Sequence, residues 1–179
     1  MVGMRARREQ VQRMSQAIRL LEKNLRTSIV AIHTNLSMTQ LRDLYREIHG
    51  HSPVSGLTPE SERAFATRQQ VIEASILLVA YTVSAGNAAF RRINIEALIK
   101  GHDFYLDARR ECVAWTHPPI DFTMAWVLAR DLRSGLVHMQ RCACGIQYAT
   151  HQFQRLQPNC PICGHGSMAK PIRHADANA

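Results

Sequence analysis

The apolar positions at the start of the chain repeat with helical spacing. From Arg5 to about Leu36 they recur every three or four residues, at Val11, Met14, Ile18, Leu21, Leu25 and Ile29. This period places them on one side of one or two helices, with a side rich in Arg and Lys opposite. The apolar stripe either packs into the core, or the helix docks on a partner or follows DNA.

A shorter amphipathic helix is predicted over residues 38–48. One face of it carries Leu41, Leu44, Tyr45 and Ile48. Ser37 stands at the N-cap position with Gln40 three residues on, the pattern of a capping box, and Gly50 is typical of a helix end. The spacing therefore predicts a well-defined helix that begins and ends at these residues.

This helix and the one before it have the order of a helix-turn-helix unit. The preceding helix runs through Ile29 and Ile32, and a polar turn follows at residues 35–37. The outward face of the second helix carries residue types that reach phosphates and base edges: Thr39, Gln40, Arg42, Arg46 and His49. Two helices with a polar turn occur in many α proteins, so this pattern alone is a weak indication of DNA binding.

The middle of the chain predicts three further helices after a turn-rich linker at residues 51–59. Their expected ranges are 60–85, 88–111 and 122–133. The first is apolar on nearly all sides between Val71 and Val83, which is typical of a central buried helix. Asp121 and Gly135 are suitable caps for the third. With 6% aromatic residues and few Gly and Pro, the composition favours a mainly α fold.

The net charge of +8 is concentrated at the two ends. Residues 1–50 hold nine Lys/Arg against four Asp/Glu, residues 51–140 hold nine against nine, and residues 141–179 hold four against one. Basic ends around a neutral middle favour contact of the ends with a polyanion and assembly through the middle. Scattered arginines that only keep the protein soluble are the alternative.

Neither a membrane segment nor a catalytic motif is evident. The most apolar stretch, Ala74 to Val83, is shorter than the roughly 20 residues that span a bilayer. A Gly-rich phosphate loop and a nucleophile motif are missing from the sequence, and Cys112 is interpreted as a free buried thiol. We expect a cytoplasmic protein that is not an enzyme, has no small-molecule substrate and does not bind membranes.

Four of the five cysteines form two close pairs. These are Cys142-Ala-Cys144-Gly and Cys160-Pro-Ile-Cys163-Gly, and fifteen residues separate Cys144 from Cys160. That spacer is typical of ribbon-type zinc sites, and paired cysteines in an odd total favour a metal over disulfides. Four thiolates complete a zinc tetrahedron without water, so we predict one structural Zn²⁺ per chain. An iron–sulfur cluster and four unmetallated thiols are the alternatives.

The first pair departs from the usual spacing, because one residue rather than two separates its cysteines. His138, His151 or His165 could therefore replace Cys142 as a ligand. We expect a helical DNA-binding and assembly domain at residues 1–140 and a zinc-ribbon-like module with a basic tail at 141–179. Basic residues in or beside this module are candidates for phosphate contacts: Arg141, Arg155, Lys170 and Arg173.

Several segments together resemble the FlhC family, the flagellar master transcriptional activator subunits. They are, in order, Leu44-Tyr-Arg-Glu-Ile48 with Gly50, Pro53 and Gly56, then Ala125-Trp126, Ser134-Gly135-Leu136, and the cysteine pairs around Thr150-His151. The resemblance runs through most of the chain. The first cysteine pair of this chain departs from the family pattern, because the family has two residues between those cysteines and this chain has one.

This resemblance implies a mainly helical, zinc-binding protein that assembles with FlhD as four FlhD and two FlhC subunits. The complex would bind double-stranded promoter DNA upstream of flagellar operons and activate transcription with RNA polymerase. Two other functions remain open from the residues themselves. One is a zinc-ribbon adaptor that docks a partner without direct DNA readout, and the other is a metalloenzyme, which would need an open metal position.

Overall fold

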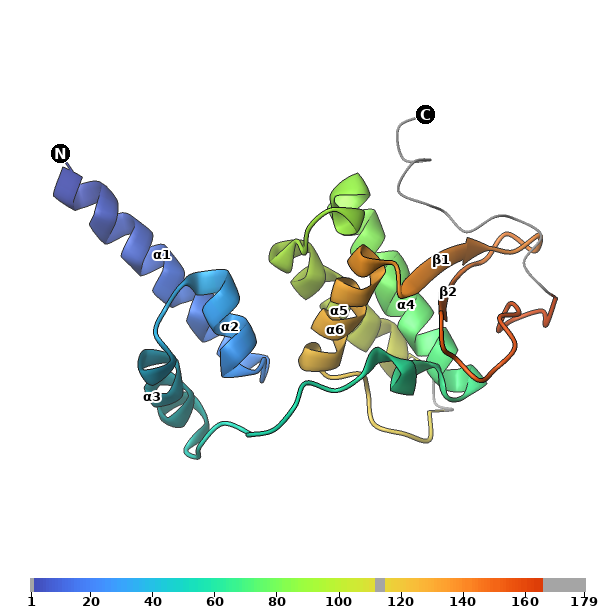
Figure 1. The fold of residues 1–179 in the computed structure, drawn as a ribbon, viewed down its shortest axis with the longest axis horizontal. Helices are drawn as coiled ribbons and strands as arrows, with labels where there is room; N and C mark the ends of the chain where they lie inside the picture. Colours follow the sequence, from blue (N-terminus) through green and yellow to red (C-terminus); the bar gives the residue numbers. More distant parts are fainter. Residues whose placement is uncertain (1, 112–114, 166–179) are drawn as a thin grey trace. The chain divides into compact units, whose positions relative to one another are not determined.

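A computed structural model describes residues 2–111 and 115–165 (Figure 1). The chain divides into two compact units at residues 58 and 59. The first unit contains α1 (Val2–Glu22), α2 (Thr27–Thr34) and α3 (Met38–His49). The second contains η1 (Ser61–Phe65), α4 (Arg68–Ala85), η2 (Gly86–Phe90), α5 (Ile95–Arg110), α6 (Phe122–Ser134), β1 (Val137–Arg141) and β2 (Gln147–His151). The predicted mainly α fold with a helix-turn-helix-like unit is confirmed.

The three helices of the first unit pack through the later part of the predicted apolar stripe. Leu21 and Leu25 are fully buried, and Leu41 of α3 is buried with them. The Tyr45 hydroxyl also donates a hydrogen bond to Asn24 Oδ1, at 3.2 Å. Val11, at the start of the predicted stripe, is 65% exposed, so the stripe enters the core only along its C-terminal part.

The turn between α2 and α3 has the predicted caps. Asn35 ends α2 in the left-handed conformation. The Ser37 hydroxyl accepts the Gln40 N–H at 3.3 Å, and Gln40 Oε1 accepts the Ser37 N–H at 3.1 Å. Gly50, with φ of 73°, ends α3. The predicted capping box is therefore confirmed, and two amides that the helix leaves without partners are satisfied.

The second unit differs from the prediction in where two helices begin. The predicted helix 60–85 is interrupted after η1, and α4 starts where the Thr67 hydroxyl accepts the Gln70 N–H at 3.2 Å. The predicted helix 88–111 is likewise divided, because Asn94 Oδ1 accepts the Ala97 N–H at 3.1 Å and starts α5. These short polar side chains bond to the backbone and compete with a continuing helix. The α6 prediction, with Asp121 as its cap, is confirmed.

Helix α4 is the centre of the second unit and contacts α5, α6 and β2. It crosses α5 closely at Gly101, where an added Cβ would lie 2.8 Å from the backbone nitrogen of Tyr81. Only a residue without a side chain fits such an approach. Gly101 thus allows the two longest helices of the unit to meet backbone to backbone.

The helical stretch Arg68–Phe90 is long and apolar enough to cross a membrane by length and composition alone, with a mean hydropathy of 1.4. The stretch is longer than the segment Ala74 to Val83 that the sequence analysis identified as the most apolar. One face of it packs in the core, where Leu77 and Leu78 are fully buried, whereas Val83 near its end is 79% exposed. Glu73, a charged residue in the same helix, is also fully buried and lies against Arg109.

A two-stranded antiparallel hairpin carries the cysteine region, and β2 packs on α4. Its register pairs Val137 with His151 and Arg141 with Gln147. The Ala149 N–H donates to Ser75 Oγ of α4 at 2.9 Å, which joins the hairpin to the helices. The predicted division at residue 140 falls inside β1, and whether 141–179 is a separate module stays a prediction.

Candidate metal centre

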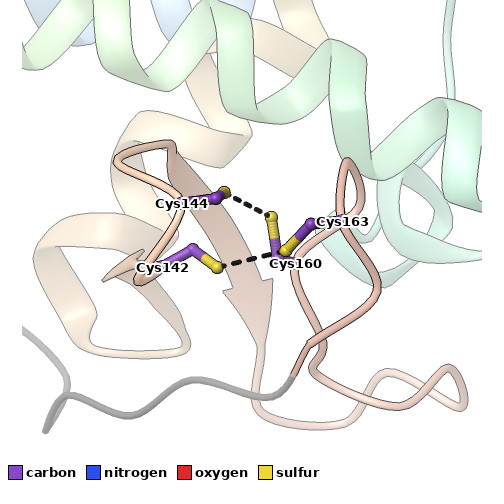
Figure 2. A group of neighbouring side chains, drawn as sticks. All are labelled: Cys142, Cys144, Cys160 and Cys163. Carbon is purple, nitrogen blue, oxygen red and sulfur yellow. Dashed lines mark hydrogen bonds between the residues drawn. The ribbon is translucent and has the colours of Figure 1, made fainter.

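Two turns bring the four paired cysteines together (Figure 2). Cys142 and Cys144 lie in the loop between β1 and β2, and Cys160 and Cys163 lie in a turn after β2. The Sγ atoms of Cys142 and Cys163 are 3.4 Å apart, and those of Cys144 and Cys160 are 3.8 Å apart. All four Sγ atoms lie within 4.8 Å of one another.

The first turn is closed by two backbone hydrogen bonds. The Cys142 N–H donates to the Ile146 carbonyl at 2.9 Å, and the Gly145 N–H donates to the Cys142 carbonyl at 2.9 Å. Gly145 has a φ of 88°, a conformation that favours glycine. The backbone therefore bends sharply just after the second cysteine of the pair.

The second turn repeats this design with one more residue. The Cys160 N–H donates to the His165 carbonyl at 2.8 Å, and the Gly164 N–H donates to the Cys160 carbonyl at 2.9 Å. Gly164, with a φ of 78°, again follows the second cysteine. The one-residue spacer of the first pair is thus matched by a turn that is one residue shorter, and both pairs present two sulfurs.

The spacing of the sulfurs fits a tetrahedral metal site. Zinc–sulfur bonds of about 2.3 Å give a tetrahedron whose sulfur–sulfur edge is about 3.8 Å. The two sulfur–sulfur distances between the pairs, 3.4 Å for Cys142 to Cys163 and 3.8 Å for Cys144 to Cys160, lie close to that edge. They are also much longer than a disulfide bond of about 2.05 Å, and all four cysteines are free thiols. The donor set is therefore suited to a thiophilic ion with no open position.

Local hydrogen bonds favour a thiolate at Cys163. The backbone N–H of His165, the His165 side chain and the Cys142 thiol lower the pKa of Cys163 to about 6. At Cys142 the Cys144 backbone N–H lowers the pKa, but desolvation and the neighbouring thiols raise it to about 12 overall. The contact between the Cys142 and Cys163 sulfurs raises the pKa of Cys142 and lowers the pKa of Cys163. Because metals bind thiolates, a metal bound at these sulfurs would displace protons, and its affinity would fall as the pH falls.

The three histidines considered as replacements for Cys142 are not in the group of clustered ligand atoms found among the described residues. His151 has other partners: its Nδ1 accepts the Phe153 N–H at 3.1 Å, and its Nε2 lies 3.0 Å from Ser61 Oγ. The Ser61 hydroxyl in turn donates to Asp131 at 2.5 Å. Burial lowers the pKa of His151, which keeps the ring neutral. These contacts join β2 to η1 and α6.

Arg68 connects the second cysteine turn to α4. Its Nε donates to the Pro161 carbonyl at 2.5 Å, and its Nη2 donates to the Ile162 carbonyl at 3.0 Å. Pro161 and Ile162 are the two residues between Cys160 and Cys163. The guanidinium therefore fixes the backbone that orients these two sulfurs. Sequence reasoning missed Arg68, because more than 90 residues separate it from its partners.

A buried ionic cluster was also not predicted. The Glu73 carboxylate of α4 accepts hydrogen bonds from Arg109 Nε at 2.5 Å and from the Tyr105 hydroxyl at 2.7 Å. His117, in the segment before α6, bonds to its other oxygen. The cluster ties α4 and α5 to that segment. Its contacts are those of a structural ion pair that satisfies a buried charge.

The candidate DNA-contacting residues on α3 are exposed in the first unit: Thr39, Gln40, Arg42 and Arg46. The Gln40 side chain takes part in the capping box, and Arg46 pairs with Asp43 at 2.8 Å. His49 was predicted on the outward face as well, and this was wrong. Its Nε2 lies 2.9 Å from the Leu21 carbonyl because the ring folds back toward α1.

The second group of basic candidates lies near the cysteine turns. Arg141, at the end of β1, and Arg155, in the loop after β2, are both exposed. Lys170 and Arg173 lie outside the described residues, and so does Cys112.

A mainly helical fold in which four clustered cysteines could complete a metal tetrahedron is typical of regulatory or binding proteins with a structural metal. The family model "Flagellar transcriptional activator (FlhC)" matches residues 4–176. The chain therefore belongs to the FlhC family of flagellar transcriptional regulators, and it is not an enzyme.

Relatives from several bacteria are similar over most of the chain. The flagellar transcriptional regulator FlhC of Paraburkholderia atlantica is 31% identical over 161 residues, which cover 89% of this chain and 73% of the relative. That of Proteus mirabilis is 30% identical over 168 residues, covering 90% and 83%. That of Thauera aminoaromatica is 27% identical over 167 residues, covering 92% and 84%.

Proposed function

We propose that Cys142, Cys144, Cys160 and Cys163 hold one Zn²⁺ per chain as four thiolates. The sulfur spacing and the two matching glycine turns support this assignment. A zinc ion with four thiolate ligands has no position for a reactive water, so its role is to fix the hairpin and the following turn. The one-residue spacer of the first pair is compatible with this role because its turn is shorter.

The chain acts as the FlhC subunit of a cytoplasmic complex with FlhD that activates flagellar operons. The observation that carries this proposal is the family match over residues 4–176, in a chain whose cysteines also cluster. By resemblance to the family, the complex contains four FlhD and two FlhC subunits. It binds double-stranded promoter DNA and acts with RNA polymerase.

DNA contacts are proposed at both basic ends. On α3, Thr39, Arg42 and Arg46 present an exposed polar face that follows a capped turn, as in helix-turn-helix proteins. Gln40 is retained as a candidate despite its capping role. Near the cysteine turns the candidates are Arg141 and Arg155, together with Lys170 and Arg173 of the tail. Phosphate contacts by such residues make DNA affinity fall steeply with salt.

Promoter binding by the chain co-expressed with FlhD, measured across a salt series for wild type and Cys163→Ser, tests the function. We expect about one zinc per chain and sequence-selective, salt-sensitive binding in the wild type, and the loss of both in the variant. Charge reversal of Arg141 and Arg155 should flatten the salt dependence. Zinc binding with only weak, salt-insensitive DNA affinity would instead identify an adaptor without direct DNA readout.

A further inference from the structure

The N-terminal half of α1 is not packed against the rest of the first unit. Every residue from 4 to 13 is exposed, whereas Ala17, Leu20 and Leu21 of the same helix are fully buried. Figure 1 shows this end of α1 extending beyond α2 and α3. Most helical stability in proteins comes from packing an amphipathic face. A partner that packs against this half of α1 would therefore stabilise the helix.

An apolar line continues from the core onto this surface. Met4 is 70% exposed and Val11 is 65% exposed, seven residues apart, and the half-buried Met14 and Ile18 extend the line. Steps of seven, three and four residues are the spacing of a coiled-coil seam. A shallow hollow of about 450 Å³ lies on the exposed part, lined by Met4, Arg7, Arg8, Val11 and Gln12.

The charges beside the line determine which partner fits. Residues 4–13 contain four arginines and one acidic residue, Glu9, which lies 3.9 Å from Arg5. Arg7, three residues after Met4 and four before Val11, lies in the line itself, and Arg8 lies beside it. A second copy of this helix would place arginines against arginines, which is repulsive. DNA would neutralise the arginines but would leave Met4 and Val11 in water. An acidic amphipathic helix covers both the apolar and the charged parts.

We propose that the face of α1 formed by Met4, Arg7, Arg8 and Val11 docks an acidic amphipathic helix of a partner protein. Met4 and Val11 pack in the seam, and Arg7 within the seam and Arg8 beside it pair with carboxylates of the partner. This proposal rests on the proposed function, which identifies the partner as the FlhD subunit. It assigns to the first unit a role in assembly besides the DNA contacts proposed on α3.

A charge-matched pair of variants tests the docking. Arg7→Glu/Arg8→Glu reverses the arginine in the seam and the one beside it. Arg5→Glu/Arg13→Glu reverses two arginines away from the seam, with the same change in net charge. Each chain is co-expressed with FlhD, and the affinity between the subunits is measured from the dissociation of the purified complex on dilution. We expect the first pair to weaken FlhD binding at least about tenfold and the second less than about twofold. Val11→Asp should also weaken it about tenfold.

The other outcomes overturn the proposal. Equal effects of the two pairs on FlhD binding, or no effect of either, would contradict docking at this face while leaving the proposed function intact. Equal loss of promoter binding with unchanged FlhD affinity would make α1 a helix that follows DNA. A wild-type chain that does not bind FlhD would contradict both the docking and the proposed function. Circular dichroism checks that helix content is kept, as expected because Glu and Arg have similar helix propensities.

Discussion

Both compact units have a core of buried apolar side chains, but the second also has polar and sulfur contacts between residues far apart in the chain. In the first unit, α1, α2 and α3 meet through buried aliphatic side chains such as Leu21 and Leu41, and the helix ends are fixed by local caps. In the second unit, polar and sulfur groups from distant parts of the chain also meet, some of them buried, such as Glu73, Cys142 and Cys160, and others exposed, such as Cys144 and Cys163. Examples are the Glu73–Arg109 pair and the four clustered cysteines.

This difference predicts how each unit responds to the loss of one group. An apolar core with local caps loses little when a single polar group is removed. A buried charge or a metal site depends on every partner, because the remaining groups are left without compensation. Substitutions of polar residues should therefore be costly in the second unit and mild in the first.

The largest effect is expected from Cys163→Ser. Structural zinc contributes on the order of 10 kcal/mol in small metal-binding domains, so loss of a ligand should release the metal and loosen the hairpin. Metal analysis should show about one zinc per wild-type chain and much less in the variant. Hydrogen exchange measured by mass spectrometry should increase in β1 and β2 but not in α2 and α3.

Cys112→Ser is the matched control for this experiment, since the fifth cysteine is not among the proposed ligands. It should keep its zinc and its exchange pattern. Full zinc content in Cys163→Ser would show that another group completes the site. Equal exchange in both units of that variant would contradict the contrast between them.

Arg109→Met should have the next largest effect. The substitution keeps the aliphatic stem but leaves the Glu73 carboxylate buried with fewer partners. Breaking a buried pair in this way costs about 3–5 kcal/mol. Denaturant unfolding should detect that loss. Arg110→Met removes an exposed arginine that pairs with Asp107, and this control should change stability by less than about 1 kcal/mol. Equal losses would mean that the buried cluster adds no stability.

Arg68→Gln tests how firmly the cysteine turn depends on α4. The variant loses the two-pronged hydrogen bond to Pro161 and Ile162, so the sulfurs of that turn are less well oriented. Residues that orient metal ligands typically change metal affinity about 10–100-fold when substituted. Competition with a chromophoric chelator measures that affinity. The control variant Arg63→Gln removes an exposed arginine of η1 and should leave the metal affinity unchanged. A similar loss of affinity in both variants would mean that Arg68 acts through its charge and not through its hydrogen bonds.

The same contrast explains how much the sequence predicted. The caps at Ser37, Gly50, Asp121 and Gly135 depend on neighbouring residues, and the residues of α3 and α6 follow closely from the pattern. The helix starts after Thr67 and Asn94 are local as well, but the apolar pattern runs through them and hid the interruption. Element type was therefore more predictable than element bounds in the second unit.

The candidate metal centre was predictable in its ligand types and not in its supports. Cysteine spacing alone indicated the set of four, because a chelating pair must lie close together in sequence. The contacts of Arg68 with Pro161 and of Ser61 with His151 join residues far apart in the chain. No local pattern reports such contacts. The His49 ring likewise contacts a group 28 residues away in the chain, the carbonyl of Leu21.

The smallest effect is expected from Ser37→Ala, in the first unit. The variant loses the hydroxyl that accepts the Gln40 N–H, which leaves one amide of α3 without its cap and costs about 1 kcal/mol. Hydrogen exchange should increase in the first turn of α3, while zinc content and the exchange of β1 and β2 stay as in the wild type. Ser15→Ala, at an exposed position within α1, should be neutral or slightly stabilising because Ala favours helix. Faster exchange in β1 and β2 of the Ser37→Ala variant would show that the two units are coupled. The two units would then unfold together and would not respond separately to the loss of a polar group.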